Sequence, residues 1–90
     1  MIPKTLEAKI LQDANRLDAL GAIGIYRVIV HSCIHKRSVQ ETIQHFEEKI
    51  LRLKDFIHTE TAKRIAAKKI KIVGDFVKRL KEEISSFSTL

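Results

Sequence analysis

Apolar residues recur every three or four positions along most of the chain, which is the period of an α-helix. This pattern predicts four helices, at Lys4–Leu20, Ala22 to about Ile34, Val39 to about His58, and Thr59 to about Phe87. The second segment is apolar at almost every position, so periodicity does not separate a buried helix from a buried strand there. Its β-branched content alone favours a strand.

Residues with capping preferences mark the ends of these segments. Gly21 is placed to adopt the left-handed conformation that often ends a helix. Ser38 and Glu41 have the spacing of a capping box at the start of the third helix. Thr59 suits the N-cap of the fourth helix. Gly74 lies inside that helix and weakens it by about 1 kcal/mol relative to alanine.

The third helix carries an unbroken apolar stripe, formed by Val39, Ile43, Phe46, Ile50, Leu53 and Ile57. The fourth helix has an apolar face of its own, so the two are expected to pack as an antiparallel helical hairpin. The tail from Ser85 to Leu90 is expected to fray. Residues 1–90 are therefore predicted to form a single all-α domain of about four helices.

Composition excludes several classes of protein. The chain is 44% apolar and 31% charged, which is typical of a globular domain rather than a disordered one. It has no apolar run near the ~20 residues that span a bilayer, and its N-terminus lacks the pattern of a secretory signal. The only cysteine, Cys33, excludes an internal disulfide, is consistent with a reducing compartment, and is expected in the core or at its boundary. A cytoplasmic protein without a membrane partner is therefore expected.

The net charge of +6 is concentrated in the later helices, in a cluster formed by Lys63, Arg64, Lys68, Lys69, Lys71, Lys78, Arg79 and Lys81. Basic surfaces attract nucleotides and nucleic acids. However, no aromatic residues alternate with these charges to stack on bases, and no zinc-finger or helix-turn-helix spacing is present. A solvated helical face is the preferred interpretation, and nucleic acid is not an expected partner.

The segment Leu11–Gly21 places two acids and an arginine among apolar residues. Asp13 and Arg16 are three positions apart, so on a helix they share a face and can pair. Acids next to core-directed leucines are costly unless they are paired, hydrogen-bonded or bound to a metal. Spacing alone favours a surface or half-buried ion-pair network, with catalysis as the second interpretation.

Three blocks of the chain, at residues 5–27, 45–55 and 59–66, resemble in this order the C-terminal part of the HD-domain metal-dependent phosphohydrolases. The resemblance implies a partial HD-like helical bundle. It also favours a helix for the second segment, in which Gly24 would allow close helix packing. The activity that it implies is hydrolysis of a phosphate ester or a nucleotide.

In that family a divalent metal such as Mn²⁺ or Mg²⁺ is held by a His, a His-Asp pair and a later Asp. By the resemblance, Asp13 would be the matching metal ligand. Asp18 would be a catalytic residue that binds or orients water or substrate. Arg16 would be a second catalytic residue, which orients Asp13 or contacts phosphate.

The chain departs from the family pattern at several positions. No His-Asp pair occurs, because none of its four histidines is followed by Asp: His31, His35, His45 and His58. The family also commonly carries an acid where this chain has Asn15, and a longer insertion where it has Ser32–Val39. One carboxylate cannot hold a hard divalent cation usefully. The expectation is therefore a truncated HD-type enzyme that is inactive alone, with metal binding weak or absent.

Two histidine features carry weaker signals. His31 and His35 are four apart, a spacing that can direct two imidazoles toward one metal, but two ligands without a third favour a surface role. His45 lies in a block that matches the family and is expected to brace the helix near the pocket.

The alternative function is a helical oligomerisation or protein-interaction module without catalysis. The apolar second helix and the stripe on the third exceed what a small four-helix unit can bury, and exposed apolar patches often mark partner surfaces. The expected partner is a second copy of the chain or a complementary half of an HD domain.

Overall fold

The computed structural model describes residues 5–88, and within this range it contains helices and no strand. Four α-helices are joined by two short helical segments of other types. They are α1 (Leu6–Asp18), α2 (Gly21–Ile34), α3 (Val39–His45), the π-helical segment η1 (Phe46–Ile50), the 3₁₀-helical segment η2 (Leu51–Phe56) and α4 (Glu60–Ser88). The predicted all-α class is confirmed, and the second segment is a helix and not a strand.

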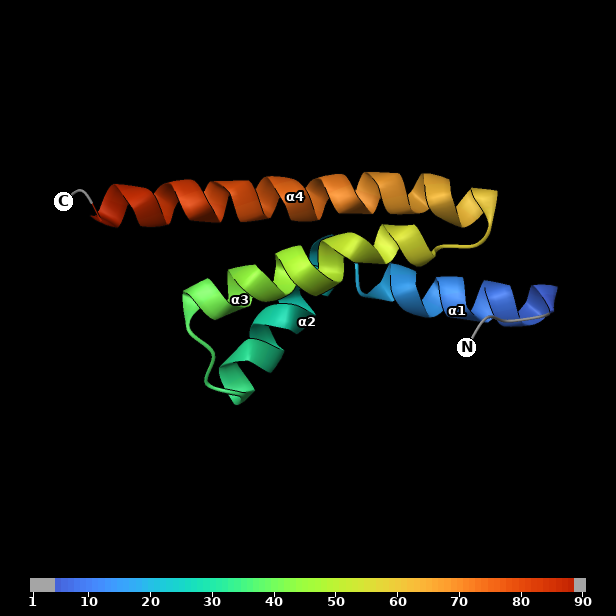
Figure 1. Cartoon of the computed structure of the whole chain (residues 1–90), viewed down its shortest axis with the longest axis horizontal. Helices are drawn as coiled ribbons and strands as arrows, with labels where there is room; N and C mark the ends of the chain where they lie inside the picture. The colour runs from blue at the N-terminus through green and yellow to red at the C-terminus, as the bar shows by residue number, and fades with distance from the viewer. Residues whose placement is uncertain (1–4, 89–90) are drawn as a thin grey trace.

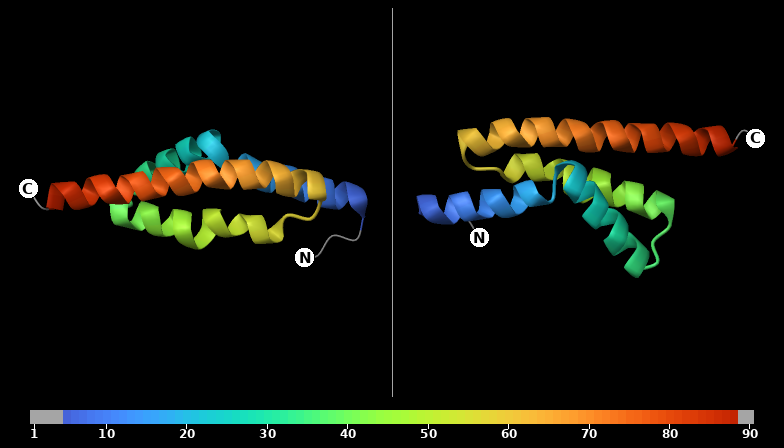
Figure 2. Two further views of the ribbon diagram at one scale, coloured as in Figure 1. Left: turned by 90° about the horizontal axis from the view of Figure 1, so that it is seen from above. Right: turned by 180° about the vertical axis from the view of Figure 1, so that it is seen from behind.

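The longest helix, α4, runs along most of the molecule, and α1 extends past its N-terminal end, while α3, η1 and η2 run beside α4 in the opposite direction (Figure 1). The predicted antiparallel hairpin is therefore confirmed. Seen from above, α1 and α2 lie on the other side of α4 from α3–η2 (Figure 2). The molecule is elongated, with extents of 54 × 25 × 18 Å. Its radius of gyration is 14.8 Å, against about 12 Å for a compact domain of this length.

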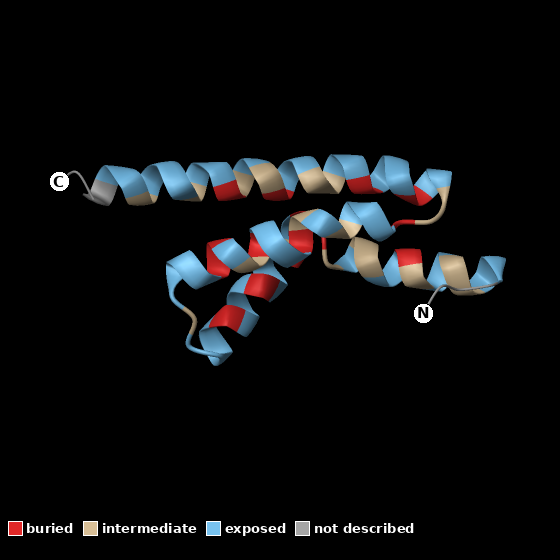
Figure 3. Cartoon of the chain, viewed as in Figure 1, coloured by how far each residue is buried: buried red, intermediate tan, exposed pale blue. Residues whose placement is uncertain are grey.

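The core lies where these helices meet, on the side of α4 that faces the others (Figure 3). Phe46 and Val73 are fully buried, and the Phe46 ring meets the Phe76 ring edge-on at 5.8 Å between centroids. The apolar stripe predicted for the third helix points into this core at its central positions, while Val39 at its start is 41% exposed. The other buried apolar residues are Leu20, Val28, Ile43, Ile50, Ile57, Ala62, Ala66 and Val77.

The turn between α1 and α2 depends on two glycines. Gly21 has a φ of +78°, so the predicted left-handed conformation is confirmed, although it lies at the start of α2 and not directly at the end of α1. A Cβ on Gly24 would overlap the carbonyl oxygen of Ala19, which confirms the close packing expected there. Lys69 of α4 closes the turn, because its Nζ donates to the carbonyl oxygen of Leu17 at 3.3 Å.

The helix caps largely agree with the sequence. Ser38 and Glu41 form the predicted capping box, with bonds of 3.1 Å and 2.9 Å. Thr59 Oγ1 accepts the Ala62 N–H at 3.3 Å at the start of α4, as expected for an N-cap. Thr5 caps α1, a cap that was not predicted. Two expectations failed: α4 continues through the serines to Ser88 where fraying was expected, and Cys33 is exposed.

Some expectations fall on residues outside the described range. The start of the first helix at Lys4 and the end of the tail at residues 89–90 are among them. The third helix was expected to reach His58, but the helical conformation ends at Phe56, because Ile57 has an extended ψ of 133°. The change to π and 3₁₀ geometry within this helix was not predicted.

Among residues 5–88, no helix taken singly has both the length and the apolar character needed to cross a membrane. α1 and α2 meet those criteria of length and composition only when they are joined. The chain bends by 68° between them.

Gly74 offers a direct test of the α4 packing. A Cβ at this position would meet nothing within 4 Å, so alanine adds no clash and removes the entropic cost of glycine in a helix. We expect Gly74→Ala to raise the free energy of unfolding by about 1 kcal/mol, measured by urea denaturation. A loss of stability would mean that α4 packs more tightly around residue 74 than described.

Candidate functional site

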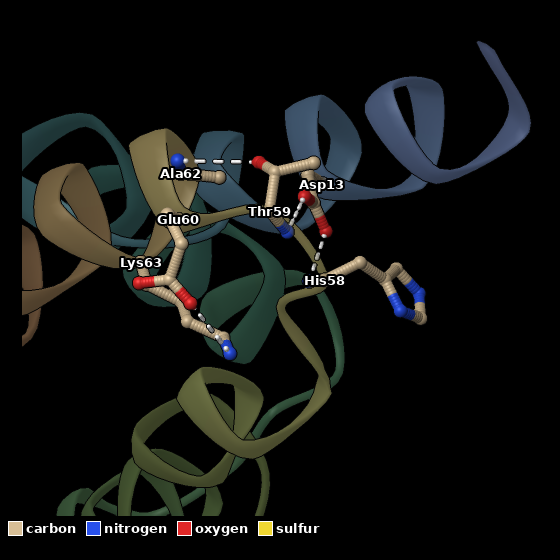
Figure 4. A network of polar contacts seen from close by, with 6 residues as sticks. All are labelled: Asp13, His58, Thr59, Glu60, Ala62 and Lys63. Carbon is tan, nitrogen blue, oxygen red and sulfur yellow. Dashed lines mark hydrogen bonds and ion pairs between the residues drawn. The ribbon is translucent and has the colours of Figure 1, made fainter. Parts of the chain in front are cut away.

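Asp13, in the middle of α1, is hydrogen-bonded to the backbone just before α4. Its side chain is buried, at 2% exposure. Its Oδ1 accepts the backbone N–H of His58 and its Oδ2 accepts that of Thr59, each at 2.8 Å (Figure 4). The first N–H groups of a helix lack partners within the helix, and its N-terminus carries a partial positive charge. The carboxylate therefore satisfies donors that would otherwise be unpaired beside α4.

Hydrogen bonding decides the charge of Asp13. Burial by itself raises the pKa of this carboxyl. The backbone N–H groups of His58 and Thr59, the Thr59 side chain and the charge of His58 lower the pKa, and together they outweigh the effect of burial. The net result is a pKa below the usual range, so Asp13 is ionised at neutral pH.

Arg16 also holds the segment before α4, but independently of Asp13. Its Nη1 donates to the carbonyl oxygen of Phe56 at 2.7 Å and to Gln12 Oε1 at 3.2 Å, and it lies 3.1 Å from His58 Nε2. The guanidinium carbon is 5.8 Å from the centre of the Phe56 ring. The expected ion pair between Asp13 and Arg16 is wrong, because Asp13 accepts the backbone N–H groups of His58 and Thr59. Arg16 instead contacts the carbonyl oxygen of Phe56 and the ring of His58.

Asp18 is in the last turn of α1, exposed, and makes no hydrogen bond or ion pair with the described residues. The structure thus brings Asp13 and Arg16 to one segment of chain and leaves Asp18 on the surface. The roles predicted for these three residues in metal binding and catalysis stay predictions. For Asp13, a metal would have to compete with two short hydrogen bonds.

A polar cleft of about 320 Å³ lies on another side of α1. We define the polar cleft by its lining residues, which come from α1, the turn, α2 and the end of α3: Asn15, Ala19, Gly24, Arg27, Val28, His31 and His45. Asn15 is two positions from Asp13, which on a helix is about 200° around the axis. The two side chains therefore serve different sides of α1.

The two imidazoles of the polar cleft are poised to be neutral. Burial lowers the pKa of His45, and the nearby charges of Arg37, His31 and Lys49 lower it further. The pKa of His31, which is an exposed residue, is also lowered, first by local desolvation and then by the charges of His35 and Arg37. Neutral imidazoles accept a proton or a hydrogen bond, while Arg27 is a permanent cation suited to phosphate.

A second groove on the surface is less promising. It has a volume of about 420 Å³ between α1 and α4 and is lined mainly by apolar residues. Its one charged group, Asp13, already has both oxygens hydrogen-bonded. Specific sites need a few polar groups that converge and remain available. The polar cleft is therefore the better candidate for a binding site.

The polar cleft does not fit a divalent metal by itself. It offers two imidazoles and one amide, and no group of three or more His, Cys, Asp or Glu side chains within residues 5–88 is placed to hold a metal ion. Divalent cations such as Mn²⁺ and Mg²⁺ favour several oxygen ligands. What these residues can do together is bind an anion and accept a proton.

Sequence reasoning missed this grouping. The sequence predicts a surface role for His31 and a bracing role for His45, and it gives Arg27 no role. One signal was present: Asn15 stands where HD-type enzymes commonly carry an acid, and it is this position, not that of Asp13, that lines the cleft. Arg27 closes the same block of resemblance, at residues 5–27.

Comparisons of sequence and of structure relate this chain to the same group of proteins. No family model matches the chain. YpgQ of Bacillus subtilis is 37% identical to it over an alignment of 86 residues, and the match covers 91% of this chain and 42% of YpgQ. The crystal structure of YpgQ in complex with ADP superposes with a TM-score of 0.84 at 33% identity, over 90% of this chain and 45% of that one.

Two further structures agree. Lin1889 of Listeria innocua has a TM-score of 0.84 at 48% identity, over 90% of this chain and 48% of its own. An HD-superfamily hydrolase of Bacillus thuringiensis has a TM-score of 0.78 at 34% identity, over 90% of this chain and 47% of its own. These similarities support a relation to the HD superfamily, whose hydrolases are in general metal-dependent, and a partial HD-like bundle. The chain spans less than half the length of these relatives.

Proposed function

We propose that these 90 residues form the C-terminal half of an HD-type phosphohydrolase of nucleotides or other phosphate esters, and that the polar cleft is their share of its substrate site. The observation that carries the proposal is that Arg27, His31 and His45 line one cleft, with the pKa of both imidazoles lowered. The relation to an HD-superfamily hydrolase and the ADP in a YpgQ crystal structure support a phosphate-bearing ligand.

In this proposal each lining residue has a limited task. Arg27 binds phosphate oxygens through charge-assisted hydrogen bonds. His45, the more buried imidazole, accepts a proton or a hydrogen bond from the substrate or its water, and His31 lies on the open side. The Asn15 amide orients the bound group. Asp13 and Arg16 act as positioning residues, because they fix the loop before α4 and with it the place of α1.

The metal ligands of the complete enzyme would come from polypeptide outside these residues, since the donors of the polar cleft do not suffice. The chain alone is therefore expected to release no phosphate from nucleotides with Mn²⁺ or Mg²⁺. Activity of the isolated chain that Asp13→Asn abolishes without unfolding it would return Asp13 to the metal site and contradict this proposal.

Binding of ADP to the isolated chain tests the polar cleft directly. We expect ADP to shift the NMR signals of the His31 and His45 rings and of the Asn15 side chain. Arg27→Ala should weaken this binding about tenfold or more, the effect of losing a hydrogen bond to a charged group. Arg64→Ala, which removes an exposed arginine from α4, serves as the matched control and should leave binding unchanged.

The results separate two causes of binding. Shifts confined to α4, or an equal loss with Arg64→Ala, would show attraction to the general positive charge and would contradict a site at the polar cleft. Inorganic phosphate that competes with ADP at the same signals would support recognition of the phosphate group.

The second candidate function, a helical interaction module, is favoured by one observation. Several large apolar residues of α2 are exposed, with Ile23, Tyr26 and Ile34 each between 66% and 70% accessible. A module of this kind would bind another helix and need no chemistry in the cleft.

A further inference from the structure

The helix α2 has one buried side and, opposite to it, an exposed apolar side. One side, which contains Gly21, Gly24, Val28 and Ser32, is buried. On the opposite side four apolar residues follow one another at spacings of three, four and four, which keeps them in line on a helix. We call them the α2 stripe: Ile23 (66% exposed), Tyr26 (69%), Val30 (39%) and Ile34 (70%).

The α2 stripe differs from the scattered apolar residues found on most surfaces. It extends over about 16 Å, given a rise of about 1.5 Å per residue. Single exposed apolar side chains need no explanation, whereas contiguous ones mark contact surfaces. Among the described residues, no other helix presents four such side chains in line.

The exposed area of the whole chain shows how much surface is unpartnered. The chain exposes 6798 Å², whereas a compact monomer of 10.3 kDa exposes about 5,400 Å². The excess is larger than the roughly 800 Å² that each partner contributes to a standard protein interface. The α2 stripe is part of this exposed surface.

The relatives indicate which partner this is. About 90% of this chain superposes on 45–48% of YpgQ and Lin1889 with a TM-score of 0.84, so roughly half of each of those folds lies outside the match. We propose that the α2 stripe is the docking face for a polypeptide equivalent to that unmatched half. The inference rests on the proposed function, because it names where the missing part of the enzyme attaches.

Charge around the α2 stripe defines the chemistry of the partner. The sequence of α2 contains no Asp or Glu, while Arg27 and His31 lie along one edge of the stripe, and Lys36 and Arg37 follow its end. An amphipathic helix with an apolar face and an acidic flank fits this surface. Because Arg27 and His31 also line the polar cleft, the acidic flank of the partner would lie at the edge of that cleft.

The same substitution in two contexts tests this proposal. The first context is the isolated chain, and the second is a chimera in which the unmatched half of the Bacillus thuringiensis hydrolase precedes it. Tyr26→Asp and Ile34→Asp change exposed positions, so we expect the melting temperature of the isolated chain to move by less than about 2 °C. In the chimera the charge would be buried, and we expect a fall of about 10 °C or more.

Ile72→Asp is the matched control, since Ile72 is 47% exposed on α4 and should have the same small effect in both contexts. Equal effects of Ile34→Asp in both contexts, or a chimera no more stable than the isolated chain, would overturn the proposal. So would an isolated chain that light scattering shows to be a dimer and that Tyr26→Asp makes monomeric, because the occupant would then be a second copy. ADP binding to the isolated Ile34→Asp chain is measured as well, because it tests the polar cleft separately from the α2 stripe.

Discussion

Replacing Asp13 with asparagine is expected to lower the free energy of unfolding by about 3 kcal/mol, a large share of what a small domain has. The reason is that both carboxylate oxygens accept hydrogen bonds from part-buried backbone N–H groups, those of His58 and Thr59, at 2.8 Å. Asparagine keeps one acceptor, but its NH₂ group would point at the other donor. Urea denaturation followed by circular dichroism measures the loss.

The matched control is Asp18→Asn, the same change five residues later on α1. Asp18 is exposed and has no partner among the described residues, so its substitution should stay within about 0.5 kcal/mol. An equal cost for both variants would mean that loss of negative charge on α1 matters and that the two hydrogen bonds do not.

At acidic pH, Asp13 should lose the stability advantage that it has over asparagine. The folded-state pKa of Asp13 is lowered, so its contribution to stability is complete above the ordinary carboxyl pKa of about 4 and is lost as the pH falls through the lower folded-state value. The difference between native chain and Asp13→Asn should therefore be constant from about pH 5 upward and shrink below about pH 4. A difference that persists unchanged at pH 2 would contradict this account.

Gly24→Ala is expected to destabilise the fold by about 2 kcal/mol, although alanine is the better helix former. A Cβ at position 24 would overlap the backbone carbonyl oxygen of Ala19, and a backbone group cannot rotate away as a side chain can. The turn between α1 and α2 must open instead. Since Gly24 and Ala19 both line the polar cleft, ADP binding should weaken together with stability.

Gly74→Ala makes this test specific, because it is the same substitution in a helix with open space around the new methyl group. The two variants should move the urea midpoint in opposite directions. If Gly24→Ala were also stabilising, the α1–α2 turn would be looser than described and the shape of the polar cleft would not depend on it.

Local sequence information determined most of the secondary structure. Helical periodicity and capping residues act within a few positions of one another, so the four α-helices, the capping box at Ser38 and the turn at Gly21 could be predicted. The second segment was the exception, because a segment that is apolar at almost every position shows no hydrophobic period that would separate a helix from a strand. There the resemblance to a family decided correctly.

The tertiary structure alone decided what the polar residues of α1 do. The partners of Asp13 are 45 and 46 residues away in sequence, and the carbonyl group that Arg16 binds is 40 residues away. No spacing rule within α1 can reveal such contacts, so an ion pair between neighbours was the natural but wrong expectation.

The candidate site was also predicted only in part from the sequence, and tertiary packing decided the rest. The sequence marked Asn15 as a departure from a family pattern, but it did not show that Asn15, Arg27 and His45 line one cleft. Helical periodicity says which residues share a face of their own helix. Only the packing of α1, α2 and α3 decides which faces meet, because that packing depends on burial between segments far apart in the chain.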